Sequence, residues 1–311
     1  MNMELSTPFI ARSCPTCLLD TGHSKSVFSK TKAESLPFSD LSKHWHGFFK
    51  EPVFFSYDRC NSCGILFCPK YFSPKQLETL YSQMPDNTAG VPLESVRKTQ
   101  YSYFKTLKKY SKLKGSLLEI GPDIGLFTEA CATEGQFDTF WLYEPNKAVH
   151  TQLTASVHGR THHIRTEMFN YDEIPNESIS TTVMVHVLDH VLDPERMLLQ
   201  IREKMEKGGI IAIVTHNEGS LLPALTKNRW PAYCLQHPQL FNPNSIQNLL
   251  KKAGYNTLGV HRTVNHFPVG YLMKHAFWAA GLMKLGSKVP NVNKLSLPLK
   301  LGNMITIGAK T

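Results

Sequence analysis

The most informative absence in this 311-residue sequence is that of acidic side chains from its last third. No Asp or Glu follows Glu218, whereas residues 219–311 hold eleven Lys or Arg, more than the formal net charge of +9. A segment of one charge sign attracts anions, such as a phosphorylated small molecule, a nucleic acid or an anionic membrane face. Solubility is the simpler explanation of the same charge, and the sequence leaves both open.

Other absences narrow the class of protein. The first residues, MNMELSTPFI, lack the basic and apolar regions of a signal peptide, so we expect a cytoplasmic protein, with contact at the periphery of a membrane as an alternative. The apolar segment 267–285 is interrupted by Pro268, Lys274 and His275, so we expect no transmembrane helix. We interpret this segment as a helical insertion that covers the acceptor site, and an interfacial helix is the alternative.

Four of the seven cysteines form two C-x-x-C pairs, Cys14 with Cys17 and Cys60 with Cys63. In a chain without an export signal, this spacing favours metal thiolates over disulfides. Two such pairs complete a tetrahedral site with four sulfur ligands, which is typical of structural zinc. The sequence therefore predicts a small zinc-binding module of the zinc-ribbon type at the N-terminus.

The stretch between the two cysteine pairs is 42 residues long, which is more than a simple zinc ribbon needs. We therefore expect an insertion, in which His44 and His46 are alternative ligands. The expected boundaries are a zinc module at 1–72 and a helical linker at 73–114 that covers the cofactor site. Within the linker, Ser73 followed by proline predicts one helix start, and apolar residues at helical spacing predict a second helix over 93–110.

After residue 114 short apolar runs alternate with amphipathic stretches, which indicates a parallel sheet with helices on both faces. The predicted strands are Leu117–Ile120, Phe140–Tyr143, Thr182–Val187, Ile210–Val214, Asn256–Val264 and Met304–Ala309.

The central motif lies where the first of these strands ends. It reads Glu119-Ile-Gly-Pro-Asp-Ile-Gly125 and is followed by a helical run, so backbone N–H groups and a positive helix end face a ligand. Gly121 and Gly125 let the chain pass close beneath that ligand because they lack Cβ atoms. Nineteen residues after Gly125, Glu144 ends the second strand, where a carboxylate accepts hydrogen bonds from both ribose hydroxyls of an adenosine.

A dinucleotide dehydrogenase shares this layout, and three details favour another class. The loop is G-x-x-x-G and lacks the tight G-x-G that approaches a pyrophosphate. Glu119 precedes the first glycine by two residues, where it can reach a cationic amino acid. The chain also ends in a late pair of strands.

In this order and spacing the motifs resemble the class I S-adenosylmethionine-dependent methyltransferases over residues 115–311. The run V-H-V-L-D-H-V-L-D-P at 185–194 is similar to their fourth-strand motif, and the segments 207–209 and 301–310 are similar to the turn before their fifth strand and to their final strand. The resemblance implies a Rossmann-like α/β core of seven strands and methyl transfer from S-adenosylmethionine. The cofactor-binding residues it implies are Glu119, Gly121, Pro122, Asp123, Gly125, Glu144, Glu167 and Met168. Tyr101 of the helical linker is a further candidate for the methionine end, with a simple packing role as the alternative.

A methyl group on a sulfonium is already activated, so the protein mainly supplies an in-line pose and a base for the acceptor proton. Residues after the fourth strand line that space, and His186 and His190 are the first candidates for the base. His216 and His237 are further candidates. The spacing of His186, Asp189 and His190 also suits a small metal triad.

The favoured acceptor is a small molecule, a sugar or a nucleotide- or lipid-linked sugar, whose phosphates suit the acid-free segment. Similar N-terminal zinc modules precede some sugar methyltransferases. An RNA methyltransferase is less favoured, because residues 1–72 lack a dense Lys/Arg run interleaved with aromatics. A non-catalytic protein that keeps the fold is the third alternative.

Overall fold

The computed structural model describes residues 9–17, 22–45, 53–82, 92–279 and 295–311. The chain divides into two compact units, each made of segments that are distant in sequence. The first unit comprises Met1–Pro92, Asn217–Ser245 and Pro268–Leu295, and the second comprises Leu93–His216, Ile246–Phe267 and Ser296–Thr311.

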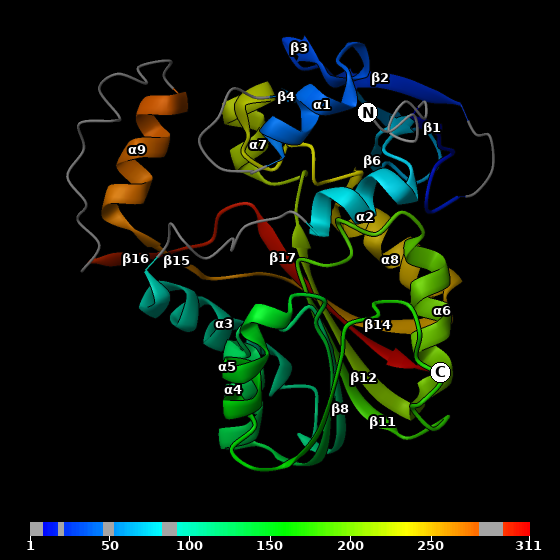
Figure 1. The fold of residues 1–311 in the computed structure, drawn as a ribbon, viewed down its shortest axis with the longest axis vertical. Coiled ribbons are helices and arrows are strands. Elements are labelled where there is room, and N and C mark those ends of the chain that lie inside the picture. Colours follow the sequence, from blue (N-terminus) through cyan, green and yellow to red (C-terminus); the bar gives the residue numbers. More distant parts are fainter. Residues whose placement is uncertain (1–8, 18–21, 46–52, 83–91, 280–294) are drawn as a thin grey trace. The chain divides into compact units, whose positions relative to one another are not determined.

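The central sheet of the second unit contains β8 (Lys114–Ile120), β9 (Gln136–Tyr143), β10 (Thr161–Arg165), β11 (Ile179–Val185), β12 (Met205–His216), β14 (Tyr255–Arg262) and β17 (Asn303–Lys310). Their order is β10-β9-β8-β11-β12-β17-β14 (Figure 1). The first five strands in this order are parallel to one another. The strand β17 is antiparallel to both β12 and β14. The strand order reverses at β8, and ligands of open α/β sheets bind at such a crossover, beyond the carboxyl ends of the strands.

Six of these strands confirm the sequence prediction, and β10 was missed. Its residues, Thr161–Arg165, include two histidines and no run of apolar side chains, because an edge strand is paired on one side only. β12 begins before the predicted turn at 207–209, and the pairing of β11 with β12 shifts register between Ile179 and Thr181. The predicted turn is therefore an irregularity near the start of the strand.

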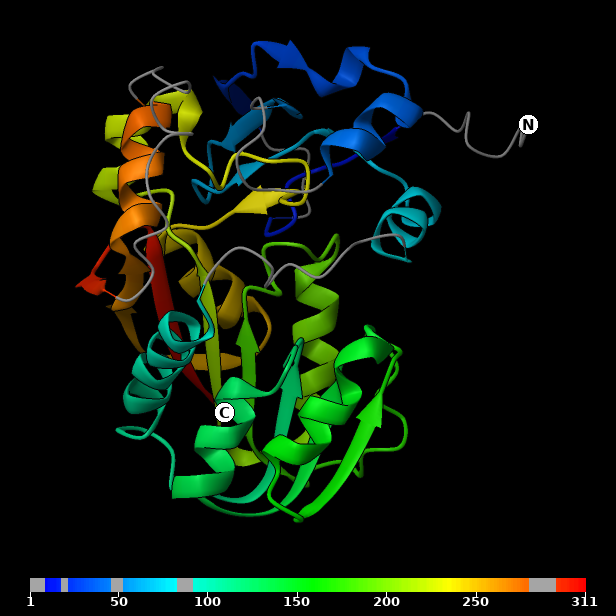
Figure 2. The same ribbon diagram turned by 60° about the vertical axis from the view of Figure 1, so that its left-hand side comes forward.

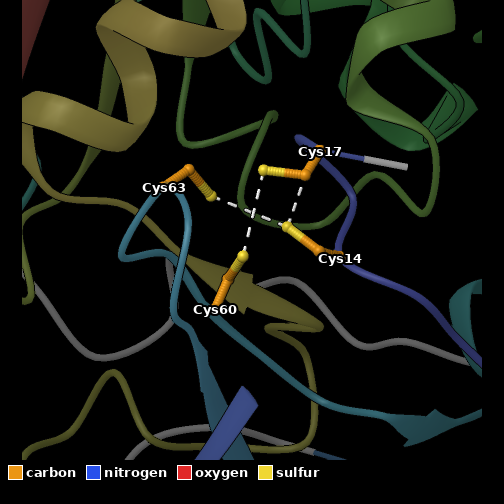
Figure 3. Close-up of side chains that lie close together, drawn as sticks. All are labelled: Cys14, Cys17, Cys60 and Cys63. Atoms are coloured by element: carbon orange, nitrogen blue, oxygen red, sulfur yellow. Dashed lines mark hydrogen bonds between the residues drawn. The ribbon is translucent and has the colours of Figure 1, made fainter. Parts of the chain in front are cut away.

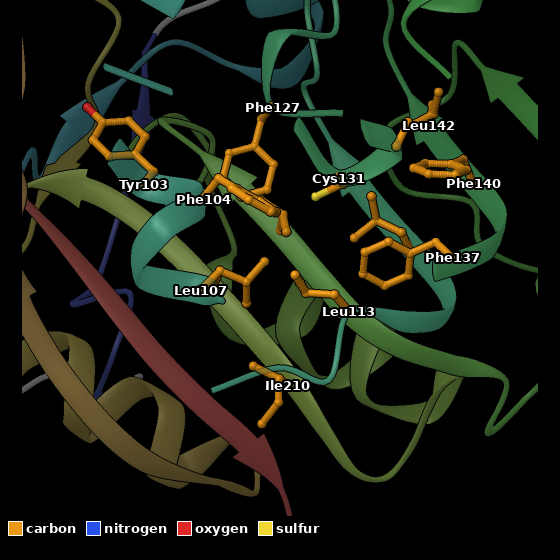
Figure 4. Close-up of a cluster of buried hydrophobic side chains, with 14 of the residues drawn as sticks. Tyr103, Phe104, Leu107, Leu113, Phe127, Cys131, Phe137, Phe140, Leu142 and Ile210 are labelled. Atoms are coloured by element: carbon orange, nitrogen blue, oxygen red, sulfur yellow. The ribbon is translucent and has the colours of Figure 1, made fainter. Parts of the chain in front are cut away.

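Helices cover both faces of this sheet (Figures 1 and 2). One face carries α3 (Leu93–Leu107), α4 (Leu126–Glu134) and α5 (His150–Ser156), and the other carries α6 (Pro194–Lys204) and α8 (Pro243–Lys252). On the first face Phe104 of α3 and Phe127 of α4 meet edge to face, with ring centroids 6.1 Å apart. Both belong to the buried cluster in Figure 4, which holds α3 and α4 against the sheet.

The first unit is built around a smaller, four-stranded sheet in the order β13-β6-β5-β2. Its strands are β2 (His23–Val27), β5 (Tyr57–Cys60), β6 (Leu66–Phe67) and β13 (Gln239–Leu240). The unit also contains the short strands β1 (Ile10–Ala11), β3 (Thr31–Lys32), β4 (Val53–Phe54) and β7 (Lys70–Tyr71), and the helices α1 (Phe38–Leu41), α2 (Pro74–Ser82), α7 (Leu221–Thr226) and α9 (Val269–Ala279). β13 pairs antiparallel with β6, so a segment more than 160 residues away in sequence completes the sheet that carries the cysteines.

Hydrogen bonds from buried tyrosines fasten this distant segment. The Tyr57 hydroxyl donates to the carbonyl of His237 at 2.7 Å, and the Tyr71 hydroxyl donates to the carbonyl of Leu235 at 2.5 Å. Because both tyrosines are fully buried, these bonds satisfy polar groups that would otherwise be costly inside the protein. Residues 217–245 are therefore a structural part of the first unit.

The boundaries of the two units differ from those expected at residues 72 and 114. α2 starts as predicted, because the Ser73 hydroxyl accepts from the Gln76 amide and Gln76 bonds back to the Ser73 amide, as in a capping box. This helix lies in the first unit, whereas α3 lies in the second. α9 covers residues 269–279 of the apolar segment 267–285, whose first two residues end the strand β15 (Asn265–Pro268). Residues 280–285 lie outside the described residues. No helix among the described residues is long and apolar enough to span a membrane.

The ion pair of Arg59 with Glu218 predicts a measurable contribution to stability. The guanidinium donates to both carboxylate oxygens, at 2.7 and 3.0 Å, and Glu218 is almost fully buried. Arg59→Ala leaves that carboxylate without its main partner, so we expect the free energy of unfolding to fall by about 2 kcal/mol in urea titrations followed by circular dichroism. Lys43→Ala removes an exposed ion pair with Asp40 and is the matched control, with a change near zero. Equal midpoints for the two variants would contradict this role.

Candidate active site

A tight loop joins β8 to α4 at the crossover of the second unit's sheet. Gly121, Asp123 and Gly125 all have left-handed backbone, with φ of 68°, 53° and 80°. The carbonyl of Pro122 accepts from the Gly125 amide at 2.9 Å and closes the turn. Left-handed backbone favours glycine, so the two glycines allow a turn of this shape directly before the helix.

The glycines are also required by their protein neighbours. A Cβ atom on Gly121 would lie 2.7 Å from a methyl group of Val187, and one on Gly125 would lie 2.9 Å from a methyl group of Leu153. Both distances are too short for two carbon atoms. The loop can therefore pack against α5 and against the turn after β11 only because the two glycines lack a Cβ atom. Close packing alone therefore accounts for both glycines, and close approach to a ligand stays a prediction.

Glu144 holds the loop from the end of β9. One carboxylate oxygen accepts from the Asp123 amide at 2.9 Å, and the other accepts from the Asn146 amide at 2.8 Å. Burial raises the pKa of Glu144, and the two backbone N–H donors oppose this by favouring the ionised form. Each carboxylate oxygen has a further acceptor site, so the group can bind a ligand without releasing the loop.

Glu119, at the end of β8, is fully buried. The hydroxyl of Thr128 donates to its carboxylate at 2.6 Å. Burial raises the pKa of Glu119 to about 7, and the nearby charge of Glu144 adds to this. A carboxyl group half ionised near neutrality responds strongly to a cation, which stabilises the charged form.

The residues implied for the adenine ring follow β10. Glu167 is exposed, Met168 is half-buried, and the carbonyl of Met168 accepts from the Tyr171 hydroxyl at 2.7 Å. Phe169, the next residue, was not predicted, and its side chain is 56% exposed. Nothing in the sequence separates this phenylalanine from those of the core, since only the structure shows its exposure.

Tyr101 lies on α3. Its hydroxyl donates to Glu134 at 2.6 Å, and Glu134 is the last residue of α4. Gly125 caps the opposite end of that helix, about 13 Å away for nine residues. Tyr101 therefore belongs to the surface between α3 and α4, and its placement near the methionine end stays a prediction.

A second group of polar side chains follows β11 and β12. Asp189 is fully buried, and one of its carboxylate oxygens accepts from both the backbone amide and Nδ1 of His216, each at 2.9 Å. Nδ1 of His186 lies 3.9 Å from the same oxygen, and the two imidazole rings are 4.6 Å apart. Sequence spacing predicts a group of His186, Asp189 and His190. In the structure it is His216, at the end of β12, that lies beside His186 and Asp189.

The other two predicted histidines differ in their surroundings. The backbone amide of His190 donates to the carbonyl of Val187, which places His190 in the same turn as His186. His237 belongs to the first unit and is buried, with Nδ1 2.7 Å from the carbonyl of Ala232 and 3.3 Å from the sulfur of Cys234. These contacts give His237 a structural task in the segment that completes the small sheet.

The four paired cysteines converge in the first unit, as Figure 3 shows. Their sulfur atoms all lie within 4.8 Å of one another, with 3.6 Å between Cys14 and Cys63 and 3.9 Å between Cys17 and Cys60. Four sulfurs bound tetrahedrally to zinc are about 3.8 Å apart, so the cluster is compatible with a zinc module. A hydrogen bond from the Cys63 thiol lowers the pKa of Cys14 to about 5, as suits a thiolate ligand.

The alternative histidine ligands are not supported. His44 does not belong to the group of ligands found among the described residues. His46 lies outside the described residues.

Comparison with known proteins shows the family of this chain. A family model described as a methyltransferase domain matches residues 95–260, which is more than half of the chain. No curated protein matches this chain.

Solved structures of methyltransferases are similar in fold. The putative methyltransferase in complex with the Trm112 methyltransferase activator of Haloferax volcanii is 9% identical and has a TM-score of 0.50, over 70% of this chain and 91% of that chain. A putative methyltransferase from Bacillus halodurans is 13% identical, with a TM-score of 0.48, over 67% of this chain and 99% of that chain. A methyltransferase from Thermotoga maritima, described as a possible histamine N-methyltransferase, is 17% identical, with a TM-score of 0.47, over 70% of this chain and 92% of that chain.

The glycine loop, the acid at the end of β9 and the strand order agree with the family match. The predicted fold class, a seven-stranded methyltransferase core with a cysteine cluster near the N-terminus, is confirmed. The chain therefore belongs to the methyltransferase-domain family.

Proposed function

We propose that this protein methylates a small molecule, a sugar or a nucleotide- or lipid-linked sugar. One observation supports binding of the cofactor: the Glu144 carboxylate accepts a hydrogen bond from the Asp123 amide. This contact holds an acceptor for ribose hydroxyls beside the glycine loop. The acid-free residues 219–311 support an anionic or phosphate-linked acceptor. When bound, S-adenosylmethionine supplies a methyl group already activated on a sulfonium.

The chain's residues divide the binding of this cofactor among them. Glu144 accepts from the ribose hydroxyls, and Glu119 pairs with the ammonium group of the methionine part. The backbone amides of the loop 121–125 and the start of α4 face the nucleoside. Glu167 and Met168 lie along the adenine ring.

Methyl transfer breaks the bond between the sulfur and the methyl carbon, leaves S-adenosylhomocysteine and releases the acceptor's proton. The residues of this chain would hold the acceptor hydroxyl in line and accept that proton. We assign this proton to His190, with His186 of the same turn as the alternative, because neutral imidazole accepts protons near cytoplasmic pH.

The cysteine cluster suits a structural zinc site, because four sulfur ligands close the ion off from water and substrate. Reduced cysteines also support a cytoplasmic location. Contact with the membrane surface would serve a lipid-linked acceptor.

Cofactor binding is predicted to depend on pH through Glu119, whose pKa is about 7 in the free protein. Below pH 7 the carboxyl group is mostly neutral and must lose a proton before it pairs with the ammonium, so affinity rises with pH. Between pH 6 and 7.5, where the ligand's ammonium stays charged, we expect calorimetry to show a rise in affinity of up to about tenfold. Glu119→Gln should bind more weakly at pH 7.5 and show a flat profile; the same slope in this variant would contradict the assignment.

The function itself is tested by transfer of a labelled methyl group to nucleotide sugars, lipid-linked sugars and RNA. We expect label in a sugar acceptor. Label in RNA alone, with steep loss of activity at higher salt, would establish the alternative class.

With the true acceptor, His190→Ala is expected to lower kcat by roughly 10²–10⁴-fold and to leave the dissociation constant of the cofactor within about twofold. His158→Ala, on an exposed turn, is the matched control and should keep the kcat of the wild type. Unchanged turnover in the His190 variant would remove it as the base.

For the cysteine cluster, protein purified without chelator is predicted to contain about one tightly bound zinc per chain, measured by elemental analysis. Cys14→Ser with Cys60→Ser should lose it. Zinc-free wild-type protein would exclude the structural metal.

A further inference from the structure

We propose that His186, Asp189 and His216 bind a divalent metal ion at the carboxyl edge of the second unit's sheet. One ligand atom from each lies within 4.8 Å of the others. The set is separate from the cysteine cluster and differs in chemistry, since it offers two imidazoles and one carboxylate. Both ends of the set are fixed by strands, because His186 directly follows β11 and His216 ends β12.

The two imidazole rings converge on one carboxylate oxygen of Asp189. Nδ1 of His216 lies 2.9 Å from it and Nδ1 of His186 lies 3.9 Å from it. Nitrogen and oxygen ligands with metal bonds of about 2.0–2.2 Å are about 3.0–3.5 Å apart. Small side-chain movements, with the His216 proton carried on Nε2 in place of Nδ1, therefore convert this arrangement into a coordination shell.

His186 is held as a ligand would be. Its backbone is left-handed, with φ of 53°, and such strain in a residue other than glycine is concentrated at active sites and ligand clamps. Nδ1, the atom that faces Asp189, is buried and has no hydrogen-bond partner among the described residues. A buried imidazole nitrogen with no such partner is costly, and an ion bound between it and the carboxylate would satisfy this nitrogen.

Asn303 of β17 completes the surroundings of this histidine. Its side-chain amide lies 3.2 Å from Nε2 of His186. The oxygen and nitrogen of an amide are interchangeable in such a contact, so Asn303 can accept from Nε2–H. Nδ1 then carries the lone pair toward the metal, which is the outer-shell arrangement of metal-bound histidine.

The site has room for further ligands. The side chains of His186 and His216 are 29% and 22% exposed, whereas Asp189 is fully buried. Three protein ligands on one side leave coordination positions open to water or substrate, as in catalytic rather than structural metal sites.

The open coordination positions give the metal ion a role in binding the acceptor, and this role rests on the proposed function. An acceptor with two adjacent oxygen atoms, such as the vicinal diol of a sugar, would bind the ion through both. Coordination lowers the pKa of a bound hydroxyl, so its proton leaves more readily to the base and the oxygen becomes a better methyl acceptor. The donor set favours Zn²⁺, Fe²⁺, Co²⁺ or Mn²⁺ over Ca²⁺ and Mg²⁺, which prefer oxygen ligands.

The test uses the full chain with its cysteine cluster saturated with zinc, titrated with Co²⁺ in the absence of cofactor and acceptor. We expect one further equivalent of Co²⁺, seen by calorimetry and by absorption bands typical of nitrogen and oxygen ligands. A thiolate charge-transfer band would instead reveal exchange into the cysteine cluster. His186→Ala and His216→Ala should each weaken binding more than about 100-fold, since loss of an outer-shell partner alone costs 10–100-fold.

His190→Ala is the matched control, because this histidine lies in the same turn but outside the ligand group, and it should keep the wild-type Co²⁺ affinity. Circular dichroism confirms that each variant is folded. Absence of the further equivalent in the wild type, or wild-type affinity in both ligand variants, overturns the metal site and leaves Asp189 and His216 as a hydrogen-bonded pair. Because no cofactor is present, failure here is distinct from failure of the proposed function, which would appear as the absence of labelled methyl from every sugar acceptor.

Discussion

The hydrogen bond from the Asp123 amide to the Glu144 carboxylate, 2.9 Å long, connects the ends of two neighbouring strands. It joins the loop after β8 to Glu144, the first residue after β9, at the point where the strand order reverses. Without it, a left-handed residue between two left-handed glycines would have little to hold its conformation. The nucleoside pocket that we propose depends on this contact, since the carboxylate that holds the loop is the one that would accept from the ribose hydroxyls.

A second constraint comes from the interleaving of the two units along the chain. Residues 217–245 directly follow the last residue of β12 and belong to the unit that carries the cysteines. β13 pairs with β6, so removal of residues 1–72 would leave β13 without its sheet neighbour. The cysteine unit is therefore not an appendage, because its sheet includes a segment from the second half of the sequence.

Local sequence patterns were sufficient for the core of the fold. The apolar runs at β8, β9, β11 and β12 exceed what a surface segment carries, and a glycine turn before a helix has few alternatives. The pairs of cysteines likewise indicated their own convergence, because C-x-x-C turns place two sulfurs together.

Features that depend on distant residues were not predictable. His216 reaches Asp189 only through the pairing of β12 with β11, and the spacing within one motif pointed to His190 instead. The helical spacing of Tyr101 does not indicate which neighbour its side chain contacts. In the structure its hydroxyl donates to Glu134 at the end of α4. No change in composition marks residues 217–245, so their place in the first unit follows from hydrogen bonds to buried tyrosines alone.

The most direct test of the account is a crystal structure of the full chain with S-adenosylhomocysteine. The account predicts the ribose hydroxyls on the carboxylate of Glu144, with the bond from the Asp123 amide intact. A nucleoside bound elsewhere, or a pocket beside Gly121 and Gly125 closed to it, would contradict the central claim.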